Sequence, residues 1–293
     1  MELKDINFED YDDIFEIIKN YNSKITDSSI KAYTLNIVKI LKDIDSTADI
    51  LLDYDKIHKF FNDSDNYKTT IRNKVNAIIN FLRGSEQDKN IIEKYSIFSD
   101  SLSVKNTKYS INEKEFNNWV TLDELKERIE ELKLKVPKIF KTYHDIALYQ
   151  RYIAGLIQVE TGLRNEIADC KIMNYDEYKN IDIDIDYNYL IIKNRCKEAK
   201  LIVQNYKTKK TFGILEIDFD EYDTKEIKNY FKEITKFKEY NNIKNNWLIF
   251  DKFGDKLNRN EYTKFLNTVF NIEDKKIGSS MIRKIILNSS CKA

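Results

Sequence analysis

The chain has 293 residues, and its 49 lysines and arginines balance its 49 aspartates and glutamates, so the formal net charge is zero. A chain without an excess of basic residues binds nucleic acid only if its positive charges are gathered on one face. The zero net charge therefore argues against a protein that coats DNA non-specifically. The three cysteines, Cys170, Cys196 and Cys291, are widely spaced, so we expect neither a disulfide framework nor a zinc site. No apolar run of membrane-spanning length and no secretory leader occurs, and we therefore expect a soluble intracellular protein with no membrane partner.

The first part of the chain has helical periodicity from residue 8 to about residue 84. Apolar residues recur at three- and four-residue spacing between Ile30 and Ile44, after the candidate capping residues Asp27 and Ser28. Similar patterns predict further helices at 8–18, 54–61 and 69–82. The sequence therefore predicts a small all-α domain of four or five helices.

Between residues 85 and 118 the apolar periodicity fades and polar residues dominate, which is typical of a linker. A new helix is then expected after Thr121, because Glu124 stands three residues later, as in a capping box. We therefore predict one helical domain at 1–100 with a linker to about 118, and a second domain at 119–293.

The second domain is predicted to be α+β, with most residues in helices around a small antiparallel sheet. Residues 147–161 form a strongly apolar helical pattern. Short β-branched runs at 189–192, 201–203 and 212–217 follow and predict strands. Helical patterns resume at 226–238 and 259–269.

Three basic residues in this domain stand in suggestive contexts. Arg164 follows a Thr-Gly turn within an otherwise apolar pattern, where a buried arginine would need an anion as its partner. Lys207 falls in the turn between two predicted strands, although Lys209 or Lys210 could be the working lysine. Arg283 follows a Gly-Ser-Ser segment near the end of the chain.

Two arginines and a lysine at one place can neutralise the oxygens of a phosphodiester, stabilise a pentacovalent transition state and protonate a leaving oxygen. Such a site requires no metal and no cofactor, and we expect none.

Each residue also has a simpler interpretation. Arg164 alone would be a surface arginine at a helix end, and the lysines of the turn a solvated cluster. His58 and His144 are interpreted as surface or half-buried residues, and Tyr206 and Tyr262 as packing residues.

Together these motifs resemble the tyrosine recombinase (phage integrase) family over nearly the whole chain. The segment from Thr161 to Arg164 resembles the first catalytic arginine motif of the family, and Lys207 stands at the position of its hairpin lysine. The segment from Ser280 to Arg283 resembles the His-x-x-Arg box, with serine in place of histidine.

The resemblance implies a core-binding domain and a catalytic domain that form a C-shaped clamp around double-stranded DNA. It also implies DNA recombination or integration through a 3′-phosphotyrosyl intermediate, and self-assembly of the full-length protein on DNA. The element at Trp119 and the Gly-Ser-Ser-x-x-Arg-Lys form resemble the branch found in large DNA viruses and associated mobile elements. That branch would place the protein in a host nucleus or cytoplasm.

The sequence departs from the family pattern at two points. Ser280 could bind a phosphate oxygen, but a serine cannot act as a general base near neutral pH. No tyrosine follows Tyr262, so the nucleophilic tyrosine is expected beyond Ala293 and this chain is not expected to cleave DNA by itself. A catalytically silent DNA-binding paralogue and a type IB topoisomerase-like enzyme are the alternatives.

Two further groups of residues are assigned through the resemblance. Glu166 and Asp169 are equal candidates for orienting Arg164. In the first domain, basic and hydroxyl residues that open the helix predicted at 69–82, with two lysines of the preceding long helix, are candidates for contacts with the DNA backbone; a solvated helix start is the alternative. These residues are Lys31, Lys39, Lys68, Thr69, Thr70, Arg72 and Lys74.

Overall fold

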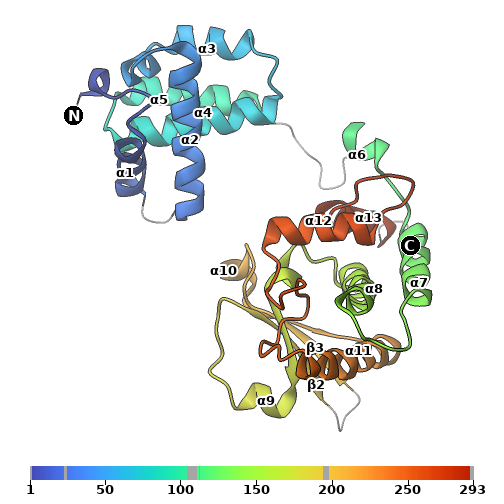
Figure 1. Cartoon of the computed structure of the whole chain (residues 1–293). Helices are drawn as coiled ribbons and strands as arrows, with labels where there is room; N and C mark the ends of the chain where they lie inside the picture. Colours follow the sequence, from blue (N-terminus) through green and yellow to red (C-terminus); the bar gives the residue numbers. More distant parts are fainter. Residues whose placement is uncertain (1, 23–24, 104–110, 112, 194–197, 291–293) are drawn as a thin grey trace. The chain divides into compact units, whose positions relative to one another are not determined.

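The computed structural model describes residues 2–22, 25–103, 111, 113–193 and 198–290. Cys196 and Cys291 lie outside the described residues. The chain divides into two compact units, Met1–Thr107 and Lys108–Ala293, and each is described by itself (Figure 1). Within the described residues, no helix is both long and apolar enough to cross a membrane.

In the described residues of unit 1, all regular secondary structure is helical. Helix α4 is central, because α1, α2 and α5 all pack against it. The bounds are a 3-10 turn at Leu3–Asp5, α1 Tyr11–Tyr21, α2 Asp27–Ile44, a 3-10 turn at Ala48–Leu52, α3 Tyr54–Asn62, α4 Lys68–Gly84 and α5 Lys89–Ser101. Helix α2 begins at Asp27 after Thr26, which makes no side-chain cap hydrogen bond, so the capping role expected of Asp27 and Ser28 was wrong.

Helix α5 lies where the sequence predicted a linker. Its side-chain cap is Asp88, which accepts a hydrogen bond from the Asn90 amide at 2.8 Å. It buries only a narrow face, chiefly Tyr95 and Phe98, and this explains why its apolar periodicity is faint. Tyr95 also donates to the Leu51 carbonyl oxygen at 2.9 Å, so the helix is fixed to the core of unit 1.

Unit 2 surrounds a small sheet with helices. The Thr121–Glu124 capping box predicted from the sequence is present, with the Glu124 amide 3.1 Å from Thr121 Oγ1. The bounds are α6 Glu113–Asn117, α7 Leu122–Leu134, α8 Tyr143–Thr161, a 3-10 turn at Glu166–Asp169, β1 Cys170–Asn174, α9 Tyr175–Lys179, β2 Asn188–Lys193, β3 Glu198–Val203, α10 Lys209–Phe212, β4 Leu215–Asp218, α11 Glu221–Tyr240, α12 Arg259–Val269 and α13 Ser279–Ser290.

The four strands form one sheet in the order β1-β2-β3-β4. Strands β2, β3 and β4 pair antiparallel, whereas β1 and β2 pair parallel, with Cys170 opposite Asn188. The predicted mainly helical fold with a small sheet is therefore confirmed, but the sheet is mixed rather than purely antiparallel. The cause is β1, which the sequence did not predict: α9 and the loop after it return the chain so that β2 runs in the same direction.

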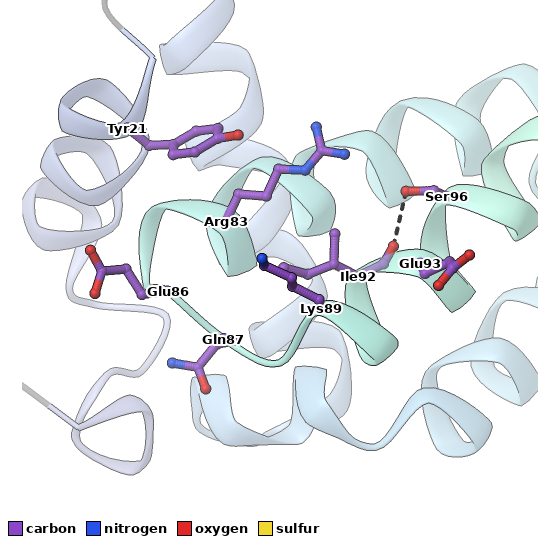
Figure 2. Close-up of a pocket in the computed structure, with 8 residues that line it drawn as sticks. All are labelled: Tyr21, Arg83, Glu86, Gln87, Lys89, Ile92, Glu93 and Ser96. Atoms are coloured by element: carbon purple, nitrogen blue, oxygen red, sulfur yellow. Dashed lines mark hydrogen bonds between the residues drawn. The ribbon is translucent and has the colours of Figure 1, made fainter.

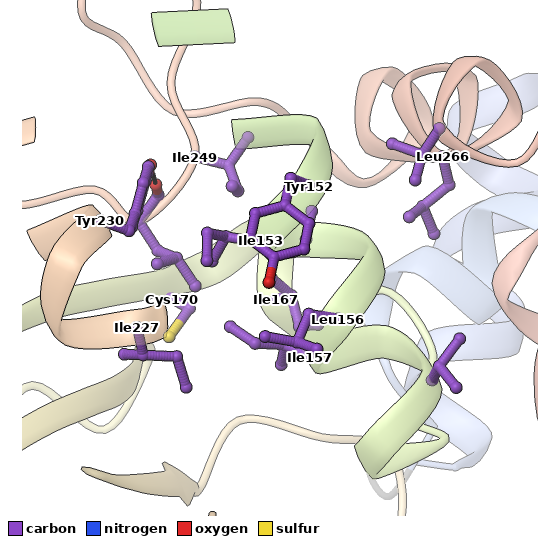
Figure 3. Packing of buried hydrophobic residues seen from close by; sticks show 14 of the residues in the cluster. Tyr152, Ile153, Leu156, Ile157, Ile167, Cys170, Ile227, Tyr230, Ile249 and Leu266 are labelled. Atoms are coloured by element: carbon purple, nitrogen blue, oxygen red, sulfur yellow. Dashed lines mark hydrogen bonds between the residues drawn. The ribbon is translucent and has the colours of Figure 1, made fainter. Parts of the chain in front are cut away.

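Helix α8 runs through the core of unit 2 and is buried on most of its surface. Figure 3 shows Tyr152, Ile153 and Leu156 of this helix among side chains from the neighbouring elements, including Ile227 and Tyr230 of α11. A helix that is apolar on nearly all sides is expected at such a central position. This burial fixes the end of α8, which leads directly into the Arg164 segment.

Candidate functional site

The turn that precedes Arg164 is set by the end of α8. Gly162 takes the left-handed conformation, with φ 58° and ψ 20°, and its amide donates to the Gln158 carbonyl at 3.1 Å. The buried side-chain amide of Gln158 donates to the carbonyl oxygen of Leu163. Glycine reaches this conformation without the steric cost that other residues have, so the chain can reverse here and release Arg164 from the helix.

Asn165 joins the segment after Arg164 to two other helices. Its Oδ1 accepts a hydrogen bond from Ser279 Oγ at 2.8 Å, at the start of α13. Its Nδ2 donates to Thr263 Oγ1 at 2.8 Å and to the Arg259 carbonyl at 3.1 Å, both in α12. The side chain of Asn165 therefore holds the Arg164 segment, α12 and α13 together.

Arg164 and Arg283 line the same hollow, which has a volume of about 300 Å³. Four parts of unit 2 form it: the end of α8 together with the segment that follows it to Glu166, the connection between β3 and β4, strand β4 and helix α13. The other lining residues are Thr161, Gly162, Leu163, Glu166, Tyr206, Thr208, Phe212, Leu215, Ile217, Ile286 and Leu287. Because both arginines are exposed, an anion from solvent can reach them; the burial expected of Arg164 was wrong.

Lys207 and Ser280 are close in the sequence to residues that line this hollow, but neither is among the described residues that line it. Lys207 is exposed and stands between Tyr206 and Thr208, which do line it. Ser280 is exposed in the first turn of α13, one turn before Arg283. Lys209 and Lys210, the other candidate lysines, lie in α10.

The two acidic candidates have different surroundings. Asp169 accepts from Lys256 Nζ at 2.9 Å and from Arg259 Nε at 3.1 Å, so it pairs with other cations and its expected role in orienting Arg164 was wrong. Glu166 lines the hollow and is 6% exposed. Within the described part of the chain, its Oε2 is buried without a hydrogen-bond partner. Glu166 therefore places an unpaired negative group beside the two arginines.

The tyrosines of this region have packing contacts. Tyr262 is fully buried, and its hydroxyl lies 3.4 Å from Gln158 Oε1; burial raises its pKa well above the ordinary value. Tyr206 is half-buried and donates to the Gly213 carbonyl oxygen at 2.7 Å. Both observations agree with the packing roles expected from the sequence.

In unit 1 the candidate DNA contacts differ in accessibility. The side chains of Lys31, Lys39, Lys68, Thr69 and Thr70 are exposed and that of Arg72 is half-buried.

Lys74 faces the core instead. It is 4% exposed, and burial lowers the pKa of its ammonium, with Asp43 opposing and Lys39 reinforcing the shift. The expectation that Lys74 contacts the DNA backbone was therefore wrong, since its ammonium is not open to a ligand.

A separate hollow of about 570 Å³ in unit 1 contains none of these candidates (Figure 2). It lies between Tyr21 of α1 and the α4–α5 connection, and residues of both charges, including Arg83, Lys89 and Glu93, line it. Mixed charge of this kind does not favour a DNA phosphate.

Comparisons with known proteins leave the family open. No family model and no curated protein matches the chain. A solved structure described as the crystal structure of XerA recombinase aligns with a TM-score of 0.39 and 13% sequence identity, over 96% of this chain and 84% of that chain.

Proposed function

We propose that this chain binds double-stranded DNA and that unit 2 holds a backbone phosphate between Arg164 and Arg283, as part of a site-specific DNA recombinase of the tyrosine recombinase type. The observation that carries the proposal is that the two arginine motifs, far apart in the sequence, line one hollow with both side chains exposed. The sequence resemblance of both motifs to that family supports it independently.

The chemistry of the hollow suits a phosphodiester. Each guanidinium can donate two parallel hydrogen bonds to a phosphate, so two of them can cover both non-bridging oxygens. Positioned donors also stabilise the additional charge that develops when the phosphorus becomes five-coordinate. The held turn at Gly162 and the hydrogen bonds of Asn165 fix the backbone near both arginines, which lowers the cost of ordering them.

We assign supporting roles to two neighbours. In the reaction that the resemblance implies, a tyrosine oxygen attacks the held phosphorus and the 5′ oxygen leaves. Lys207, exposed beside the hollow, is proposed as the donor of the proton to that leaving oxygen. Ser280 is proposed to donate its hydroxyl to a phosphate oxygen, since it lies one turn before Arg283 on α13.

The test is binding of the chain to random duplex DNA across a series of salt concentrations. The wild type is compared with Arg164→Ala plus Arg283→Ala, and with a control, Arg83→Ala plus Lys264→Ala, which removes the same charge from exposed positions outside the hollow. Because both arginines are proposed to hold the same phosphate, their loss should reduce the slope of log affinity against log salt by about 1. The control should change the slope by less.

Two results would contradict the proposal. The first is wild-type affinity in the Arg164 and Arg283 double variant, which would mean that DNA binds elsewhere. The second is an absence of binding by the wild type at low salt. Circular dichroism of every variant separates lost contacts from lost structure.

A further inference from the structure

Unit 2 has a second concave site, whose charged lining residues are mainly acidic, whereas the hollow described above contains two arginines. This groove, of about 520 Å³, lies between α7, the end of α8 and the start of α11 and shares no residue with the hollow that contains Arg164. Helices α7 and α11 both pack against α8 (Figure 1). Aliphatic side chains, among them Ile129, Leu156 and Val159, give the groove an apolar surface. Leu134, at the end of α7, also lines it and is 87% exposed.

Acidic residues dominate the charged lining of the groove. Lys126 is the one cationic residue among the described lining residues. Six of the lining residues carry a carboxylate: Glu127, Glu130, Glu131, Glu160, Asp220 and Asp223. Glu131 pairs with Arg128 at 2.7 Å and Glu130 accepts from the Tyr222 hydroxyl at 3.3 Å, so part of this charge already has partners.

Asp223 is the residue whose surroundings point to a ligand. It is 5% exposed, and its carboxylate accepts no hydrogen bond from the described residues, although it lines the groove. Burial is the main cause that raises its pKa to about 7; Glu160 of α8 and Asp220 and Glu226 of α11 add to the shift, and Lys126 of α7 opposes it. A buried carboxylate without a partner is costly, and a cation placed in the groove would offset that cost.

The spacing of the acids selects the kind of cation. Among the described residues, no group of three or more acidic, histidine or cysteine side chains converges well enough to hold a metal ion. The acidic lining residues stand on α7, at the end of α8 and near the start of α11, and aliphatic residues of α7 and α8 line the same groove. An ammonium group needs only one or two carboxylates, and a methylene chain gains free energy by covering apolar surface.

We propose that this groove binds a linear aliphatic polyamine, with its ammonium groups at Asp223 and Glu160 and at the carboxylates of α7, and its methylene chains on Leu156 and Val159. A volume of about 520 Å³ lies within the range of small-molecule sites. The proposal is independent of the DNA-binding function proposed above, because no residue is common to the two sites.

The test is calorimetric titration of the full chain with spermidine at constant ionic strength. Asp223→Asn plus Glu160→Gln keeps the shape of the groove and removes two charges, and it should weaken binding by about tenfold. The matched control is Glu93→Gln, an exposed carboxylate in the hollow of unit 1, which should bind as the wild type does. Affinity should rise from pH 6 to pH 8 because a bound ammonium favours ionised Asp223, and Asp223→Asn alone should flatten this rise.

Three outcomes would overturn the proposal. One is equal binding of spermidine by the wild type and the double variant, which would mean diffuse attraction to surface charge. Another is displacement of spermidine by an equal concentration of Mg²⁺. The third is binding of a short lysine-leucine peptide without any binding of spermidine, which would assign the groove to a protein partner.

Discussion

The hydroxyl of Ser279 donates to the side-chain oxygen of Asn165 at 2.8 Å, and this bond connects the residue after Arg164 to the helix that carries Arg283. The backbone segments that carry the two proposed phosphate-binding arginines are therefore joined by the side chain of Asn165. Much of the preorganisation of the site depends on Asn165.

Replacement of Asn165 should test this role. In Asn165→Ala, the Arg164 segment loses its bonds to α12 and α13, and we expect DNA affinity to fall by about fivefold to tenfold while both arginines remain. The matched control is Asn241→Ala, which removes a local side-chain hydrogen bond at the end of α11. If both variants bind DNA as the wild type does, Asn165 is structural only.

Glu166→Gln should increase affinity for DNA. The Glu166 carboxylate lines the hollow with an oxygen that has no partner among the described residues, so it opposes an incoming phosphate. Removing one charge at this range should strengthen binding by about threefold to tenfold, most visibly at low salt. A loss of affinity would show instead that Glu166 orients Arg164, as the sequence resemblance implies; Glu160→Gln, outside the hollow, is the control.

Gly162→Ala should destabilise unit 2 by about 1–2 kcal/mol. A methyl group here would meet only Ile286 Cδ1, at the ordinary distance of 3.6 Å, so the cost comes from the left-handed backbone rather than from a clash. Gly278→Ala is the control, because it has space for a methyl group and no positive φ, and it should be close to neutral. Denaturant unfolding of both variants measures the difference.

The stability of the chain should depend on pH through Lys238. This lysine is 7% exposed and donates to the Trp247 carbonyl at 2.8 Å, and burial lowers its pKa to about 7. An unfolded lysine holds its proton up to about pH 10.4. Between these values the unfolded state binds more protons than the folded state, so the free energy of unfolding should rise as pH increases above 7.

Lys238→Met should remove this dependence, and thermal unfolding between pH 7 and pH 9 measures it. The exposed Lys225→Met is the control and should keep the wild-type slope. An unchanged slope in Lys238→Met would show that other groups cause the dependence.

Helices and strands whose periodicity lies within their own residues could be predicted from the sequence. Elements that form only through contacts with residues distant in the sequence could not. Helix α12 was predicted at its observed bounds from its helical pattern alone, and in the structure Asn258 and Glu261 form a capping box at its start. Strand β1 was missed, since five residues without alternation become a strand only beside β2. The beginning of α11 was placed five residues late, because its cap, Asp220, was not recognised.

The same distinction holds for the candidate site. The contexts of Arg164 and Arg283 were informative, and both residues line one hollow, whereas the bridging role of Asn165 depends on helices distant in sequence. Lys74 did carry a signal that could have excluded it. It stands three residues after Ile71 and four before Ile78, on the buried stripe of α4.

Strand β1 closes one edge of the sheet to other chains. On the side away from β2, the Ile172 amide donates to the Asn246 carbonyl at 2.7 Å, and the Leu248 amide donates to the Cys170 carbonyl at 2.9 Å. The opposite edge, β4, carries the exposed acids Glu216 and Asp218, both within ion-pair distance of Lys200. On one edge these backbone groups already have hydrogen-bond partners, and on the other edge the strand carries charged side chains. Both features disfavour the addition of another strand, so unit 2 should resist edge-to-edge aggregation during its folding.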